Sequence, residues 1–167
     1  MIYLGVGANL PSPRFSTPRE TLEAAMSDLG RRGIVSVSVS RWYESAPVPV
    51  SDQPWYVNAV YQVETEQDAA TLLGNLHAVE ADYGRVRGAV NAARIIDLDL
   101  LDFRGAIRDG ACGPILPHPR MHERAFVLFP LRDVAPDWRH PVSGASIDSL
   151  IAALDPDQTV RLLGSAG

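Results

Sequence analysis

The segment 95–103, IIDLDLLDF, is typical of a buried β-strand, yet it carries two carboxylates in its middle. Alternate side chains of a strand point to the same face, so Asp97 and Asp99 should project together and Asp102 to the opposite side. Two neighbouring carboxylates repel each other, and burying them without a partner is costly. The segment therefore predicts either a divalent cation beside the aspartates, because hard cations take carboxylate oxygens, or an edge strand with one solvated face.

The size and composition of the chain limit the class of protein. Its 167 residues are enough for a single domain over residues 1–167 with its own core. The net charge of −5 argues against nucleic-acid binding, which needs a basic face. No apolar run reaches about 18 residues, and the N-terminus lacks a signal-peptide pattern. We therefore expect a cytoplasmic monomer that binds neither nucleic acid nor membrane.

The sequence contains no lysine, and all 15 basic residues are arginine. A P-loop and Schiff-base chemistry are thereby excluded. Any phosphate must be held by arginine, backbone N–H groups or a metal ion, and the planar guanidinium fork suits phosphate oxygens. The only cysteine, Cys112, has no partner for an intrachain disulfide and no basic neighbour to activate its thiol.

Strand and helix patterns follow one another in the order β-α-β-β-α-β, which is the ferredoxin-like pattern. Thr17, Pro18 and Glu20 form a helix start with a capping box, and Gly84 is a helix stop. The expected strands lie at 2–8, 34–43, 55–64 and 95–103, and the expected helices at 17–30 and 68–83. Further helices are expected near His118 and at 147–154, with a short β segment. The fold class is therefore α+β, with a ferredoxin-like core and additional C-terminal helices.

The segments 34–43 and 55–64 both alternate, which predicts one buried face for each strand. In the second segment, Tyr56 and Asn58 share a face. A tyrosine ring and a carboxamide suit a flat heterocycle, which they would bind by stacking and paired hydrogen bonds. Ordinary strand packing is the alternative.

Two further segments carry clustered basic side chains. Arg85, Arg87 and Arg94 lie in the loop before the Asp-bearing strand, where they could stabilise charge on a phosphoryl group, or form a solvated basic loop. In the segment 116–131, LPHPRMHERAFVLFPL, a helix would place two histidines on one face. The pattern lacks a third metal ligand and the second histidine of H-E-x-x-H.

The members of the second basic cluster are His118, Arg120, His122 and Arg124. This density favours an anion such as a nucleotide phosphate, and the alternative is a capped helix with a solvated face. The N-terminal GVGANL lacks the third glycine of a dinucleotide-binding fingerprint, so that function is not indicated.

Five motifs together resemble the 6-hydroxymethyl-7,8-dihydropterin pyrophosphokinase family of folate biosynthesis. They are GVGANL, SAPV with DQPWYVNAV, VEADYGRVR, RIIDLDLL and LPHPRMHERAFVLFPL, in the family order over about residues 1–137. The resemblance implies transfer of pyrophosphate from ATP to the hydroxymethyl oxygen of the pterin, with release of AMP. It also implies in-line attack on the β-phosphorus, assisted by two Mg²⁺ ions.

The resemblance further implies roles for single residues. The metal ligands would be Asp97 and Asp99, and the catalytic residues Arg85, Arg94 and Asp99. The pterin would be bound by Ser45, Val48, Tyr56, Asn58 and Phe126. ATP would be bound by His77, Glu80, Arg87, His118, Arg120 and Arg124.

The chain departs from the family pattern in places. Its arginine loop reads GAVNAAR and is a residue shorter than in some members, and Gly113 and Ile115 stand where some place an arginine and a threonine. The last 30 residues match no functional motif and are expected to close the core.

Two other functions are alternatives to the pyrophosphokinase. One is a metal-dependent nucleotidyl- or glycosyltransferase with a D-x-D motif, and the other is a non-catalytic ferredoxin-like domain that senses a nucleotide or metal. Release of AMP as the product would separate the pyrophosphokinase from both.

Overall fold

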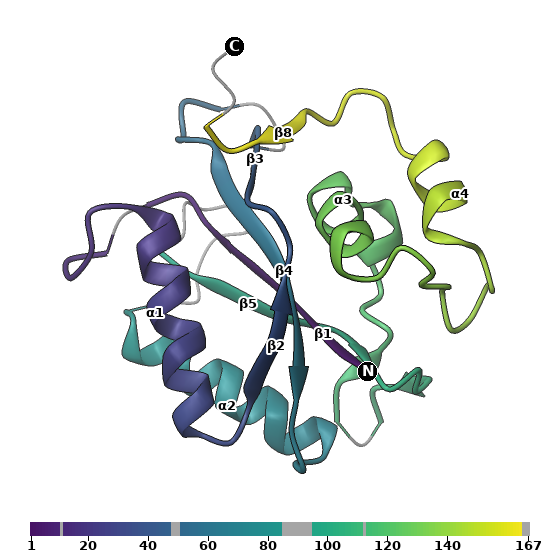
Figure 1. Cartoon of the computed structure of the whole chain (residues 1–167), viewed down its shortest axis with the longest axis horizontal. Helices are drawn as coiled ribbons and strands as arrows, with labels where there is room; N and C mark the ends of the chain where they lie inside the picture. The colour runs from purple at the N-terminus through teal and green to yellow at the C-terminus, as the bar shows by residue number, and fades with distance from the viewer. Residues whose placement is uncertain (11, 48–50, 85–94, 112, 165–167) are drawn as a thin grey trace.

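The computed structural model describes residues 1–10, 12–47, 51–84, 95–111 and 113–164, and these form an α+β fold (Figure 1). The strands of the main sheet are β1 (Ile2–Ala8), β2 (Val35–Val39), β3 (Tyr43–Ser45), β4 (Tyr56–Glu64), β5 (Asp97–Phe103) and β8 (Val160–Leu162). A second, two-stranded sheet contains β6 (Arg108–Asp109) and β7 (Ile115–Leu116). The helices are α1 (Pro18–Arg31), α2 (Ala69–Asp82), α3 (Ala125–Val134) and α4 (Ile147–Ala152), with a 3-10 turn η1 (Met121–Glu123).

The main sheet is antiparallel and has helices on both faces. Its strand order is β5-β1-β4-β3-β8. Strand β2 also pairs with β4, along its C-terminal part, whereas β3 pairs with the N-terminal part of β4. One core lies between the sheet and the helices α1 and α2, and a second core lies under α3 and α4 on the other face (Figure 1). None of the helices in the described ranges is long and apolar enough to span a membrane.

Local capping explains where the first two helices begin. The hydroxyl of Thr17 accepts a hydrogen bond from the Glu20 N–H at 3.2 Å, and Asp68 accepts one from the Thr71 N–H at 2.8 Å. The hydrogen bonds from Thr71 hold the pKa of Asp68 below its ordinary value. Helix α2 ends before Gly84, whose φ of 83° suits glycine. These boundaries confirm the predictions from sequence.

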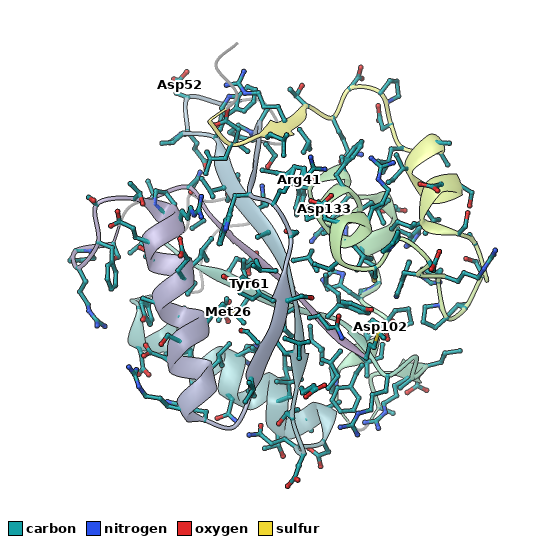
Figure 2. All side chains as sticks on the ribbon, in the orientation of Figure 1. Met26, Arg41, Asp52, Tyr61, Asp102 and Asp133 are labelled. Atoms are coloured by element: carbon teal, nitrogen blue, oxygen red, sulfur yellow. The ribbon has the colours of Figure 1, made fainter. Side chains whose placement is uncertain are left out.

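Strand β4 confirms the predicted alternation. Val57, Ala59, Tyr61 and Val63 belong to the core under α1 and α2, whereas Val60 belongs to the core under α3. Figure 2 shows Met26 of α1 and Tyr61 of β4 in the first of these cores. Tyr56 and Asn58 have the parity of Val60, so they face the α3 side of the sheet.

The prediction of one strand with a buried face over 34–43 is wrong. The segment is divided into β2 and β3, and all five residues of β2 are exposed. A register shift between Ser36 and Ser38 interrupts the alternation, and β2 pairs only with β4 at the margin of the sheet. Its valines therefore reach solvent, with exposures of 46–55%.

Asp102 lies on the face opposite to the predicted one. Leu101 has no partner in β1, because the register between β1 and β5 shifts there. This bulge reverses the face to which the Asp102 side chain points. The Asp102 carboxylate accepts hydrogen bonds from Trp138 Nε1 at 2.8 Å and from the Gly105 N–H at 2.9 Å. Trp138 packs with Leu101 in the core under α3, so Asp102 faces the same side as the other two aspartates of β5.

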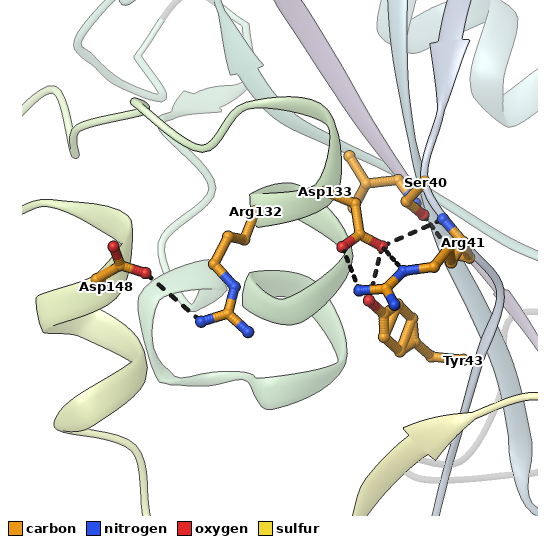
Figure 3. A network of polar contacts seen from close by, with 7 residues as sticks. Ser40, Arg41, Tyr43, Arg132, Asp133 and Asp148 are labelled. Carbon is orange, nitrogen blue, oxygen red and sulfur yellow. Dashed lines mark hydrogen bonds and ion pairs between the residues drawn. The ribbon is translucent and has the colours of Figure 1, made fainter. Parts of the chain in front are cut away.

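A carboxylate near the end of α3 joins this helix to the sheet (Figure 3). Asp133 accepts hydrogen bonds from the Tyr43 hydroxyl at 2.6 Å and from the Arg41 guanidinium at 2.9 Å. Burial alone would raise the pKa of Asp133, but the hydrogen bonds from Arg41 and Tyr43 hold it below its ordinary value. Burial and the bond to Asp133 raise the pKa of Tyr43 to about 12, so its hydroxyl remains a donor at neutral pH.

We expect Trp138→Phe to lower the free energy of unfolding by about 1–3 kcal/mol, because the buried Asp102 carboxylate loses its indole donor. Urea denaturation followed by circular dichroism measures this change. The same exchange at the half-buried Trp55 is the control, with a change of less than about 0.5 kcal/mol. Equal losses in both variants would show that the hydrogen bond to Asp102 contributes nothing specific.

Candidate functional site

The candidate site lies on the α3 side of the sheet, where two glycines of β1 separate polar residues of β4 and β5. Gly7 is paired with Asn58 on one side and Asp97 on the other, and Gly5 is paired with Asp99. Cross-strand partners point to the same face, so these side chains and the two glycines share one surface. The structure thus places Asn58 and the Asp pair on either side of two β1 positions that carry no side chain.

Space rather than backbone conformation requires a glycine at position 7. A Cβ atom added to Gly7 would lie 2.9 Å from Asn58 Oδ1, closer than real Cβ contacts allow. At Gly5 the same atom would lie 3.3 Å from the Leu101 side chain. No role for these two glycines was predicted from the sequence. Their spacing of two within a strand was the available signal, since it places both on one face.

Three of the residues proposed for a flat ligand are brought together at this surface. Asn58 is buried, and its Nδ2 donates a hydrogen bond to Ser45 Oγ at 2.8 Å. Ser45 is paired with Tyr56 across β3 and β4, so all three residues share the face. The bond to Ser45 fixes the orientation of the Asn58 carboxamide.

Helix α3 adds Phe126 and Arg124 to the same side of the sheet. Val127 and Leu128 pack with Val60 of β4 in the core under α3, and Phe126 packs against this core at its margin. The guanidinium carbon of Arg124 lies 5.5 Å from the centre of the Phe126 ring. An aromatic ring and a cation are therefore held next to each other at the start of α3.

Glu80 supports the Asp-bearing strand from the helix side. Its side chain is buried, and Oε2 accepts a hydrogen bond from the Leu98 N–H at 2.9 Å, between the two aspartates. Strand β5 is the last strand at its edge of the sheet, so this N–H would otherwise lack a partner in the sheet. The position predicted for ATP contact thus also anchors the strand. His77 lies one turn earlier on α2 and is exposed.

His118 is connected to the same strand but does not lie in a helix. Its N–H donates to the Leu101 carbonyl at 2.8 Å. The prediction that a helix places His118 and His122 on one face is wrong, because the 3-10 turn begins only at Met121. Pro119 explains the difference, since a residue before proline is disfavoured in the helical region.

The protonation of His118 follows from its surroundings. Burial lowers the pKa of His118 to about 4, the charge of Arg124 adds to this, and Asp97 opposes it. Its Nδ1 accepts a hydrogen bond from the Arg120 N–H at 3.1 Å, so in the neutral ring Nε2 carries the proton. At neutral pH, His118 is therefore an uncharged donor.

A hollow of about 280 Å³ joins several of these positions. It is lined by residues of α2, β5 and the segment after β7, and among them are Asp99, His77, Glu80 and His118. This volume is at the small end of the range for ligand sites. The hollow therefore lies beside Asp99, and Asp97 is not among its lining residues.

The Asp pair fits a magnesium ion that is shared with a ligand. In the described ranges, no group of three or more His, Cys, Asp or Glu side chains is placed to hold a metal. Asp97 and Asp99 offer partly exposed carboxylates on one face. Mg²⁺ keeps several waters and binds through one or two carboxylates plus substrate phosphates, which matches this donor set.

Not every predicted site residue can be placed. Val48, Arg85, Arg87 and Arg94 lie outside the described residues. Arg120 is exposed in the turn after His118. The roles of these residues stay predictions.

Comparisons with a family model and with known proteins indicate the same family. The model of the family 7,8-dihydro-6-hydroxymethylpterin-pyrophosphokinase (HPPK) matches residues 3–136. The chain is 38% identical to 2-amino-4-hydroxy-6-hydroxymethyldihydropteridine pyrophosphokinase of Pseudomonas aeruginosa over 98% of each chain. It is 35% identical to the protein of the same name in Methylorubrum extorquens, over 96% of this chain and 97% of that one.

Longer proteins also match. The folic acid synthesis protein fol1 of Pneumocystis carinii is 37% identical over 89% of this chain, which spans only 19% of that protein. A solved structure described as HPPK-DHPS in complex with substrates superposes with a TM-score of 0.67 at 13% identity. The match covers 90% of this chain and 42% of that one, and it shows the fold alone.

We expect the ring protons of His118 to titrate with a pKa of about 4 in NMR spectra of the ligand-free protein, with His118→Gln assigning the signal. An unfolded histidine has a pKa of about 6.5, so the unfolded state takes up the proton first as the pH falls. The contribution of His118 to stability is therefore complete above about pH 6.5 and is lost toward pH 4. A midpoint near 6.5 would contradict the burial of this ring.

Proposed function

The chain belongs to the 7,8-dihydro-6-hydroxymethylpterin-pyrophosphokinase family of folate biosynthesis, and we propose that it transfers pyrophosphate from ATP to the hydroxymethyl oxygen of 6-hydroxymethyl-7,8-dihydropterin, releasing AMP. One observation carries the proposal. The Asp pair and Asn58 face the same side of the sheet across two glycines. A phosphate site and a site for a flat heterocycle thus lie side by side, as a transfer between two bound substrates needs.

The pterin would bind in an acceptor slot, defined as Ser45, Tyr56 and Asn58 on the sheet and Phe126 on α3. Tyr56 and Phe126 are the rings that can stack on a pterin, and the oriented carboxamide of Asn58 can pair with its polar edge. The bond from Asn58 to Ser45 supports this proposal, because it holds the carboxamide in one orientation. Val48 belongs to this set by resemblance to the family.

ATP would bind beside the slot, over the hollow next to β5. His118 and Arg124 lie on this side, and the neutral His118 can donate through Nε2 without a change of charge near neutral pH. By resemblance, Arg120, Arg85, Arg87 and Arg94 add further contacts to the phosphates. His77 and Glu80 of α2 line the hollow and would contact the nucleotide there.

The reaction is an in-line displacement at the β-phosphorus of ATP. The hydroxymethyl oxygen forms a bond to this phosphorus, the bond to the oxygen bridging the α- and β-phosphates breaks, and AMP leaves with that oxygen. Two Mg²⁺ ions held by Asp97 and Asp99 would neutralise and align the triphosphate. Asp99 would also accept the hydroxyl proton. The remaining rate enhancement comes from holding the two substrates in line.

We also infer a ferredoxin-like core and a monomer in the cytoplasm. The strand order β5-β1-β4-β2, connected through α1 and α2, supports the ferredoxin-like core. The acceptor slot and the Asp pair come from a single chain, which supports a monomer. The single cysteine is consistent with the cytoplasm.

AMP release from ATP and Mg²⁺, measured with and without 6-hydroxymethyl-7,8-dihydropterin, tests the reaction. We expect pterin-dependent AMP release by the wild type and a loss of at least about 100-fold in Asp97→Ala, because the metal loses a carboxylate ligand. Asp109→Ala changes an exposed aspartate of β6 and serves as the control. AMP release that does not depend on the pterin, or full turnover in Asp97→Ala, would refute the proposal.

Gly7→Ala tests the contact between β1 and Asn58. The added methyl must displace the Asn58 carboxamide, so we expect the KM for the pterin to rise about tenfold or more. Gly30→Ala in α1 is the control, because nothing lies within 4 Å of the added atom. Steady-state kinetics with both substrates, together with circular dichroism, distinguish a shifted site from a misfolded chain. An unchanged KM for the pterin would show that Asn58 does not bind it.

A further inference from the structure

The last described strand is preceded by a glutamine that bonds to the start of α3. The Ala125 N–H donates to Gln158 Oε1 at 2.9 Å, and Gln158 Nε2 donates to the Glu123 carbonyl at 2.9 Å. Both ends of one carboxamide therefore bond to the backbone on either side of Arg124. A side chain 33 positions away along the chain thus holds the residue that begins α3.

The start of α3 lacks the usual local stabilisation. Arg124 occupies the N-cap position, and its side chain forms no capping hydrogen bond. Serine, threonine, asparagine or aspartate would cap the helix, and a cation at this end opposes the helix dipole. Gln158 supplies, from elsewhere in the chain, an acceptor for the first N–H of the helix, so the helix start is stabilised while the N-cap position carries a guanidinium.

The residues after Gln158 connect to the other side of the acceptor slot. The Ala46 N–H donates to the Thr159 carbonyl at 3.2 Å, and Val160 of β8 is paired with Ser45. The segment 158–162 therefore contacts both the strand that carries Ser45 and the helix start that carries Phe126. It thus links the two sides of the slot, through its backbone on the β3 side and through the Gln158 side chain on the α3 side.

We propose that Gln158 is a positioning residue of the pyrophosphokinase, which holds the start of α3 so that Arg124 and Phe126 face their ligands. The inference rests on the acceptor slot proposed above. Gln158 contacts neither substrate in this proposal. It acts through the backbone of residues 123–125, so its effect passes through the two side chains beside them.

The test is a double-mutant cycle on the KM for the pterin. Gln158→Ala should raise this KM about fivefold, as the loss of two hydrogen bonds that orient the helix start suggests. Phe126→Ala should raise it about tenfold or more, since stacking on an aromatic side chain is lost. In the Phe126→Ala background, Gln158→Ala should add less than about a twofold change, because the side chain through which it acts is gone. Asp157→Ala, an exposed neighbour, is the control and should match the wild type.

Other outcomes would overturn the inference in distinguishable ways. If Gln158→Ala lowers the melting temperature but leaves the KM for the pterin unchanged, Gln158 is structural only. Equal effects of Gln158→Ala in both backgrounds would show that it does not act through Phe126. If Phe126→Ala itself leaves the KM for the pterin within twofold, the acceptor slot is wrong and the inference fails with it, even where AMP release remains pterin-dependent. Gln158→Glu keeps the acceptor for Ala125 and provides a folded variant if the alanine variant is unstable.

Discussion

Asp133 accepts hydrogen bonds from Tyr43 and Arg41 at the end of α3 where the helix dipole disfavours a negative charge. Because Tyr43 lies in β3, these bonds hold the C-terminal end of the helix against the strand that also carries Ser45 (Figure 3). A helix that is held at this end can place its first residues reproducibly only if the other end is also held. The proposed acceptor slot would therefore depend on a pair of contacts at opposite ends of one ten-residue helix.

On the sheet, by contrast, the site needs two positions that carry no side chain. Gly5 and Gly7 carry no side chain between the strands of Asn58 and the Asp pair, and the space that a Cβ atom would need is taken by the side chains of Leu101 and Asn58. The carboxylates remain partly exposed at the edge of the sheet, which reduces the cost of placing them side by side. His118 stays neutral near pH 7, so the positive charge that balances a triphosphate must come from arginine and metal.

Local patterns predicted much of this fold, and tertiary contacts explain the failures. The cap at Thr17, the start of α2 near residue 68 and the alternation of β4 were predictable because they depend on residues a few positions apart. The exposure of β2 depends on a register shift against β4, and the face to which Asp102 points depends on a register shift of β5 against β1. No single segment of the sequence encodes such a shift. Motif resemblance predicted site roles for Asn58 and the Asp pair, and the structure places these residues on one surface. It could not indicate the spacing role of Gly7, which appears only once Asn58 is beside it.

The C-terminal part of the chain shows why contacts of this kind escape prediction from motifs. The family model ends at residue 136, and the residues proposed to touch substrates all lie before that point. Beyond it, Trp138 bonds to Asp102, Gln158 bonds to the start of α3, and β8 pairs with β3. Two of these three contacts use backbone groups of the partner segment, which every residue type except proline provides. Such contacts constrain the path of the chain more than its side chains, so a C-terminal segment can position the site without carrying a recognisable motif.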